Sequence, residues 1–178
     1  MSNRTVIVDN NTWNNTHIAT VAKALISDED EAYRISKHLD AKYVLVVFGG
    51  YINYNSDDYA KFLWFVRIAA SEYTGIDETA YYKNGRFNPS EDGLSEKMYN
   101  SLAFKCMYYR FNEIHTQHGK KPGFDRARWK QTSFKDIQFK HFREVYTSQL
   151  WMVRVFEVLD EPNRGPEFTE PPNRKFFI

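Results

Sequence analysis

One stretch of the sequence carries a carboxylate, an ammonium group and an aromatic ring at helical spacing. Asp58, Lys61 and Phe65 follow one another at i, i+3 and i+7, which places them on one face of a helix. A polar pair on an otherwise apolar helix can line a substrate pocket. The same spacing also suits a local ion pair, which stabilises a helix by roughly a few tenths of a kcal/mol. Spacing alone leaves both interpretations open.

Three Asn-x-Thr triplets begin at Asn3, Asn10 and Asn14. In a secreted or lumenal protein such triplets can accept an N-glycan, and they then lie on exposed loops. The other interpretation is turn and cap chemistry, because Asn and Thr side chains can satisfy the free N–H groups of a helix's first turn. Their close spacing favours glycosylation without deciding it.

Other chemistries find little support in the sequence. Cys106 is the single cysteine, which excludes a disulfide within the chain and a cysteine-based metal site. We interpret His115 and His118 as solvated loop residues and residues 119–135 as a solvated basic loop. Lys and Arg number 24 against 23 Asp and Glu, so the net charge of +1 gives no general case for nucleic acid or an anionic membrane as partner.

The chain of 178 residues, 42% of them hydrophobic, is long enough for one folded domain. We expect that domain over residues 1–160 and a poorly ordered, proline-rich tail over 161–178. Apolar runs without alternation predict strands at residues 5–8, 43–48 and 152–158 in one sheet. Such runs are typical of a parallel sheet covered by helices, so the expected fold class is α/β with a small, mostly parallel sheet.

Helical periodicity places the candidate residues at one end of that sheet. The helix that carries Asp58 follows the Gly49-Gly50 loop at the carboxyl end of the central strand, where open α/β sheets bind ligands. Ser56 and Asp57 suit its cap, and Ser27 suits the cap of an earlier helix. The sequence predicts helices over residues 16–26, 28–39, 58–68, 95–112 and 139–146.

Residues 8–19 closely resemble a segment of the catalytic subunit family of eukaryotic oligosaccharyltransferases. The similarity continues in order through residues 43–50, 57–68, 108–111, 122–126 and 151–154. This resemblance implies the lumenal C-terminal domain of a multi-pass membrane enzyme of the endoplasmic reticulum. The family transfers an oligosaccharide from dolichyl pyrophosphate to Asn of an Asn-x-Ser/Thr acceptor polypeptide.

The resemblance also implies which parts of that enzyme lie elsewhere. The family's Mn or Mg is held by acidic residues of the membrane region, so we expect no metal ligand and no catalytic residue in this stretch. The Trp-Trp-Asp-Tyr-Gly motif is expected about ten residues before Met1. The fragment by itself should be inactive. The implied partners are other oligosaccharyltransferase subunits, the acceptor and the lipid-linked donor, with no nucleic acid.

The family's Asp-x-x-Lys-x-x-x-Met/Ile motif is matched by Asp58 and Lys61, whereas Phe65 stands where Met or Ile is usual. The resemblance implies an acceptor-pocket role for the first two residues and leaves a direct contact by Phe65 in doubt. It also favours glycans on Asn10 and Asn14, and less firmly on Asn3.

A competing hypothesis is a non-catalytic, glycosylated lumenal module that docks partner subunits or peptides. A weaker alternative is a Rossmann-like enzyme acting on a small molecule, against which the missing glycine fingerprint counts.

Overall fold

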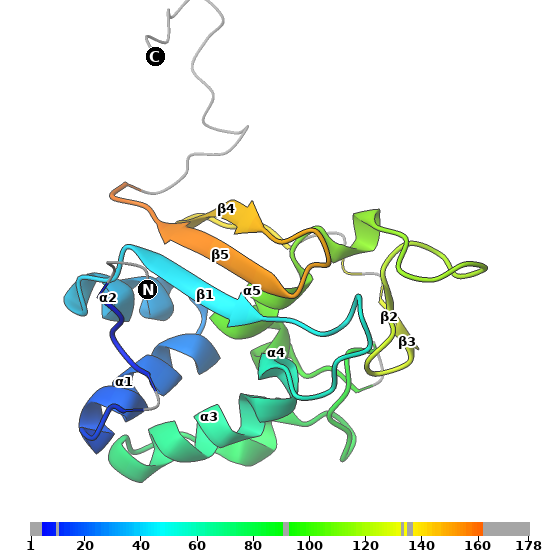
Figure 1. Cartoon of the computed structure of the whole chain (residues 1–178). Helices are drawn as coiled ribbons and strands as arrows, with labels where there is room; N and C mark the ends of the chain where they lie inside the picture. The colour runs from blue at the N-terminus through cyan, green and yellow to red at the C-terminus, as the bar shows by residue number, and fades with distance from the viewer. Residues whose placement is uncertain (1–4, 10, 91–92, 133, 135–136, 162–178) are drawn as a thin grey trace, which may run out of the picture.

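A computed structural model describes residues 5–9, 11–90, 93–132, 134 and 137–161. Its centre is a three-stranded antiparallel sheet in the order β1-β5-β4, made by Tyr43–Val47, Val153–Val158 and Phe142–Thr147 respectively. A separate two-stranded sheet pairs β2, Phe124–Asp125, with β3, Lys130–Gln131. Figure 1 shows the larger sheet above helices α1, α3 and α5, with the small sheet at the far end.

Helices supply the layer beneath the sheet. α1 and α3 pack against each other, and α2 adjoins α1. The helices and 3-10 turns are α1 (Asn15–Ile26), α2 (Glu29–His38), α3 (Asp58–Glu72), η1 (Glu78–Tyr81), α4 (Glu96–Asn100), α5 (Leu102–Tyr108) and η2 (Phe111–Glu113).

The prediction of a mostly parallel sheet is wrong. β1 and β5 run antiparallel, with Leu45 opposite Val155, and residues 5–8 form no strand. The apolar run of β1 misled the prediction because its two faces differ: Val46 is buried, whereas Tyr43 and Leu45 are 48% and 59% exposed. A strand with apolar residues on an open face has the same unbroken apolar sequence as a strand that is covered on both faces.

Two helix predictions also fail. Residues predicted as a helix over 139–146 largely form β4, which bulges between Glu144 and Tyr146 and pairs with β5. β-branched and aromatic residues such as Val145 favour this strand. The helix predicted over 95–112 is broken at Ser101, whose extended backbone ends α4 and whose hydroxyl accepts from the Phe104 amide to begin α5.

Helix starts follow the predicted cap chemistry more closely. α1 begins after Asn14 and α3 after Asp57, and each cap side chain accepts from an amide of the first turn. Ser27 was the expected cap of α2, but Asp28 performs that role and Ser27 ends α1. Ser and Asp are both common N-cap residues, so the prediction was wrong by one position.

The core is aromatic and lies between the sheet and the helices. The Phe48 ring packs edge-on against Tyr108 and Phe111, with ring centroids 4.9 Å apart in both pairs. Cys106 is fully buried, as predicted for a core residue. The predicted tail falls almost wholly on residues 162–178, outside the described residues. Among the described residues, no helix is long and apolar enough to cross a bilayer.

Candidate functional site

Two adjacent carboxylates attach the start of α3 to the edge of β1. Asp58 Oδ2 accepts from the Val47 amide at 2.7 Å, and Asp57 Oδ2 accepts from the Gly49 amide at 2.7 Å. The amide between them, that of Phe48, points the other way and donates to the Met152 carbonyl on the β5 side. Amides of a strand alternate in this manner, so the carboxylates replace a neighbouring strand at this end of β1.

Asp58 and Lys61 lie together, as the spacing predicts. Lys61 Nζ is 3.8 Å from Asp58 Oδ1, and the lysine side chain is 44% exposed against 19% for the aspartate. Burial raises the pKa of Asp58, while the Val47 amide and the Lys61 charge act in the opposite direction. Asp58 is therefore an anchored carboxylate, and the Lys61 ammonium is the accessible group of the pair.

Phe65 does not present an open aromatic surface beside this pair. It is half-buried and packs against the hydrophobic core. The exposed ring on α3 is Trp64, which is 62% exposed and lies one helical turn beyond Lys61, with Ile68 following on the same face. The motif spacing directed attention to Phe65 and missed Trp64.

A buried ion network lies directly behind Asp57. Arg128 Nη1 donates to both Asp57 oxygens at 2.9 and 2.7 Å, and its Nε donates to Asp125 Oδ2 at 2.8 Å. Tyr108 donates its hydroxyl to the same Asp125 oxygen at 2.6 Å. Both carboxylates are fully buried.

This network corrects the interpretation of residues 119–135 as a solvated loop, because Arg128 is paired inside the molecule. The Asp125-x-x-Arg128 spacing is the sequence signal that could have indicated it. The network fixes the turn after β2 to the start of α3, and hence to the segment that carries Asp58. It therefore helps to hold Asp58 and Lys61 in place.

The amino-acid sequence of the chain is similar to those of known proteins. The chain is 54% identical over 164 residues to the dolichyl-diphosphooligosaccharide–protein glycosyltransferase subunit STT3B of Arabidopsis thaliana. It is 51% identical to the STT3B subunit of Oryza sativa subsp. japonica and 49% identical to the STT3 subunit of Dictyostelium discoideum, each over 165 residues. These matches cover 92–93% of the chain. Over this segment the chain belongs to the STT3 family.

The chain spans about a fifth of the length of the STT3 relatives that it matches, 22% of the Arabidopsis subunit and 23% of the other two. No family model matches it. A crystal structure of the C-terminal globular domain of oligosaccharyltransferase from Archaeoglobus fulgidus aligns with 85% of this chain and 70% of its own, at 14% identity and a TM-score of 0.38. That likeness is too distant to bear on the fold.

The Asn14 triplet of this STT3 segment is accessible. Asn14 is exposed at the start of α1, as predicted, and its Oδ1 accepts from the His17 amide at 2.9 Å. The cap uses the oxygen of the side-chain amide, so the nitrogen, to which an N-glycan attaches, is not required for it. Asn3 and Asn10 lie outside the described residues.

The described part of the chain does not suit the divalent metal implied by the STT3 family. It contains no group of three or more His, Cys, Asp or Glu side chains placed to hold a metal ion. The carboxylates nearest the site are already engaged, Asp57 by Arg128 and Asp58 by the Val47 amide. His115 and His118 are exposed, as predicted.

Proposed function

We propose that this chain is the lumenal C-terminal part of the catalytic subunit of an oligosaccharyltransferase in the endoplasmic reticulum membrane. The proposed reaction is transfer of an oligosaccharide from dolichyl pyrophosphate to the Asn side chain of an Asn-x-Ser/Thr acceptor. The observation that carries the proposal is the 54% identity, across 92% of the chain, to a subunit named for dolichyl-diphosphooligosaccharide–protein glycosyl transfer.

In this proposal the Asp58–Lys61 face backs the pocket for the acceptor polypeptide. Asp58 serves as a positioning residue, because one of its oxygens is bound to the Val47 amide. Lys61 offers three N–H donors on a largely accessible ammonium, which suit a hydroxyl or carbonyl oxygen of the acceptor. A hydrogen bond from Lys61 to the acceptor hydroxyl would favour acceptors that carry this hydroxyl over acceptors that lack it.

The remaining parts of the reaction are assigned to other segments and subunits. The ligands of Mn or Mg are expected outside this chain, where the metal would supply charge stabilisation for the leaving pyrophosphate. The proposal therefore includes no catalytic residue here, and the isolated chain should show no transfer. Its partners are the acceptor, the lipid-linked donor and other oligosaccharyltransferase subunits. The triplets at Asn3, Asn10 and Asn14 are proposed glycan sites.

The test inserts this segment into the full-length Arabidopsis subunit in place of its own counterpart. Lys61→Ala should lower turnover of an acceptor peptide by about tenfold or more, the amount expected for a lost hydrogen bond from a charged group. The thermal midpoint of the isolated domain should not change, and Lys61→Arg should retain part of the activity. Normal turnover in the Lys61→Ala enzyme would overturn the proposed acceptor-pocket role and favour a local ion pair of Asp58 and Lys61.

A further inference from the structure

The hairpin that joins β2 to β3, with the loop before it, concentrates positive charge. Residues 114–132 contain five Lys and Arg residues but a single carboxylate, Asp125. That carboxylate is fully buried and paired with Arg128. The exposed charges of this segment are therefore all positive. They are Lys120, Lys121 and Lys130, with Arg126 half-buried beside them.

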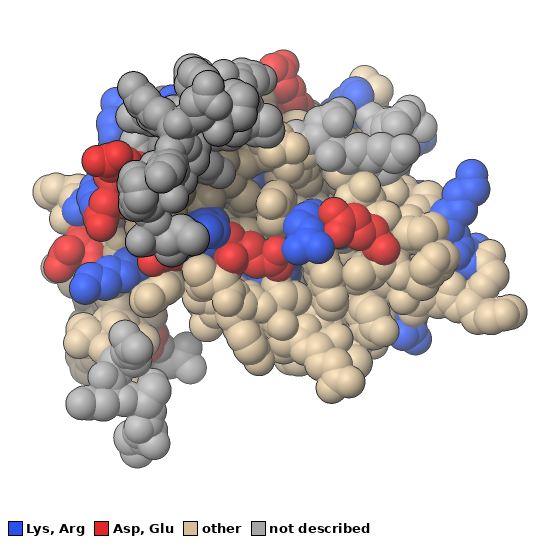
Figure 2. All heavy atoms as spheres, turned by 90° about the horizontal axis from the view of Figure 1, so that it is seen from above, with Lys and Arg blue, Asp and Glu red and all other residues tan. Residues whose placement is uncertain are grey.

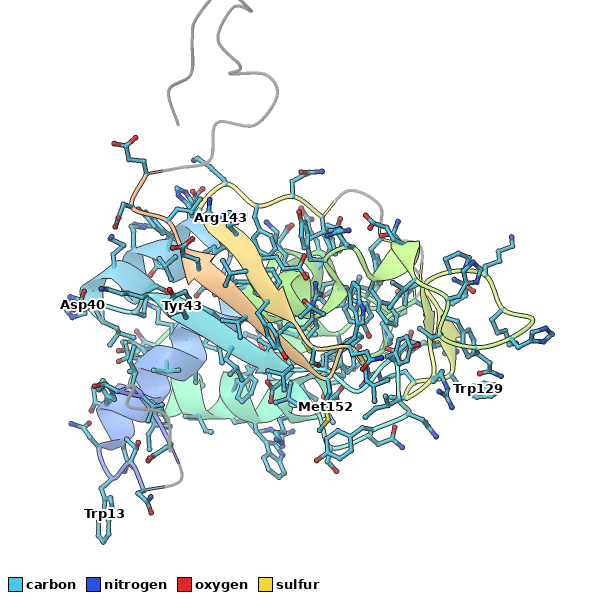
Figure 3. The ribbon with its side chains drawn as sticks, turned by 45° about the horizontal axis from the view of Figure 1, so that its top comes forward. Trp13, Asp40, Tyr43, Trp129, Arg143 and Met152 are labelled. Carbon is cyan, nitrogen blue, oxygen red and sulfur yellow. The ribbon has the colours of Figure 1, made fainter. Side chains whose placement is uncertain are left out.

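An indole ring stands among these cations. Trp129 is 62% exposed and has a left-handed backbone, with φ of 56°. It packs edge-on against Phe124 at 5.3 Å, and Lys120 Nζ lies 4.9 Å from the Phe124 ring and 5.9 Å from the indole. In Figure 3, Trp129 lies at the end of the molecule remote from Trp13 and Asp40. A single exposed ring is ordinary at a protein surface, but here the ring lies among exposed cations.

The body of the protein holds this hairpin in place. The Arg126 amide donates to the Gly50 carbonyl at 2.8 Å, and its guanidinium donates to the Tyr51 carbonyl at 3.1 Å. The amides of Ala127 and Arg128 both donate to Asp125 Oδ1 at 3.0 Å. Trp129 and the lysines are thus displayed on an ordered support, so binding through them need not order a loop.

The low net charge of the whole chain gives no sign that positive charges gather in this segment. A balance of 24 cations to 23 carboxylates predicts no charged partner, yet the carboxylates lie elsewhere. On the face seen in Figure 2, the right-hand end carries blue spheres and no red ones. A local patch of one sign creates a local field even when the whole molecule is nearly neutral.

We propose that this end of the molecule, the hairpin surface formed by Lys120, Lys121, Trp129 and Lys130, docks on an anionic lipid bilayer. Tryptophan is enriched at the bilayer–water interface, where its ring sits among the headgroups and its N–H stays hydrated. Each Lys near an anionic membrane contributes about 1 kcal/mol to binding.

A nucleic acid fits this surface less well. Single-stranded nucleic acid binds along basic grooves that carry several aromatic platforms, whereas residues 114–132 expose Trp129 as their one large ring. The inference is independent of the proposed enzymatic role.

Docking would also orient the candidate acceptor face. Arg128, within the same turn, binds Asp57, and Asp57 directly precedes Asp58 at the start of α3. A bilayer that holds the hairpin therefore lies at the end of the molecule from which α3 begins. An acceptor bound at Lys61 would then be kept beside the membrane surface.

The experiment is vesicle flotation with the full chain. Vesicles of phosphatidylcholine with roughly one-third phosphatidylglycerol should bind the protein at low salt, and pure phosphatidylcholine vesicles should not. Binding should fall at high salt because the attraction is screened. Replacing Lys120, Lys121 and Lys130 together by Glu should weaken binding by about a hundredfold or more, and Trp129→Ala should weaken it on its own.

Two matched controls keep the test specific. Trp13→Ala removes another exposed ring, at the end of the molecule remote from Trp129 in Figure 3. Lys42→Glu reverses an exposed charge beside β1. Neither should alter vesicle binding.

Equal binding to neutral and anionic vesicles would overturn the proposal, and so would an unchanged affinity in the hairpin variants. Tighter binding to single-stranded RNA than to anionic vesicles would also overturn it, assigning the surface to nucleic acid. Circular dichroism spectra establish that each variant is folded.

Discussion

The Asp58 carboxylate is bound to the Val47 amide at 2.7 Å and lies only 3.8 Å from the Lys61 ammonium. The two members of the motif therefore differ in their tasks. Asp58 joins α3 to the edge of β1, while Lys61 stays accessible. Variants of the two residues should consequently separate stability from function.

Replacing Asp58 should affect folding according to what the new side chain can accept. Asp58→Ala leaves the Val47 amide unpaired and should lower the free energy of unfolding by about 1–3 kcal/mol. Asp58→Asn keeps an acceptor oxygen and should lose less. Lys61→Ala should change stability by at most about 1 kcal/mol, because the ammonium that it removes is 44% exposed and lies 3.8 Å from its partner. Urea unfolding of the isolated domain measures all three, and equal losses for Asp58→Ala and Asp58→Asn would contradict the assigned hydrogen bond.

Arg154 should be the most sensitive cation of the sheet. It is fully buried on β5, donates to the carbonyls of Cys106 and Met107 at 2.7 and 3.0 Å, and pairs with Glu144 at 2.7 Å. Arg154→Ala should cost about 3–5 kcal/mol, because it removes the buried partner of Glu144 and takes this donor from the carbonyls of Cys106 and Met107.

The control for this prediction is Arg143→Ala, which removes a 65% exposed partner of Glu157 in the same sheet. It should cost less than about 1 kcal/mol. Comparable midpoints of unfolding for the two variants would show that burial does not determine how much each ion pair contributes to stability.

Glu144 should make stability depend on acid pH. Burial by itself would raise its pKa, but hydrogen bonds from Thr147 and Arg154, with the charges of Arg154 and Arg110, together hold the pKa below its ordinary value. The folded state then binds fewer protons than the unfolded chain, so stability is present above the ordinary carboxyl pKa and is lost as the pH falls through the folded value. Glu144→Gln should flatten this acid limb in a series of urea titrations. An unchanged slope would rule out Glu144 as its source.

Two substitutions of Asn14 distinguish its role as a helix cap from its role as a glycan site. Asn14→Asp keeps an oxygen for the His17 amide, so the domain should keep its thermal midpoint while losing any glycan at this position. Asn14→Ala should lose the glycan and also about 1 kcal/mol of stability. Electrophoretic mobility after expression in a eukaryotic secretory pathway, with and without glycosidase, reports occupancy. A wild-type protein whose mobility does not respond to glycosidase would dispose of the glycan hypothesis.

The sequence by itself determined features that depend on neighbours a few residues apart. The caps Asn14 and Asp57 and the i, i+3 approach of Asp58 and Lys61 follow from local geometry, and the structure confirms them. The likeness of the chain to the oligosaccharyltransferase subunits was also legible from the order of short segments along it.

Tertiary structure alone decided which strands pair and which cations are buried. An apolar run does not state the direction of its partner, so β1 and β5 could be expected parallel and were found antiparallel. Residues that favoured a helix before β5 became β4 because that strand completes the sheet. Arg128 and Lys130 are two residues apart, yet one is buried between carboxylates and the other is exposed. Arg128 is paired with Asp125 and with Asp57, which lies 71 residues earlier. Burial of a charge requires a partner that the fold must bring to it.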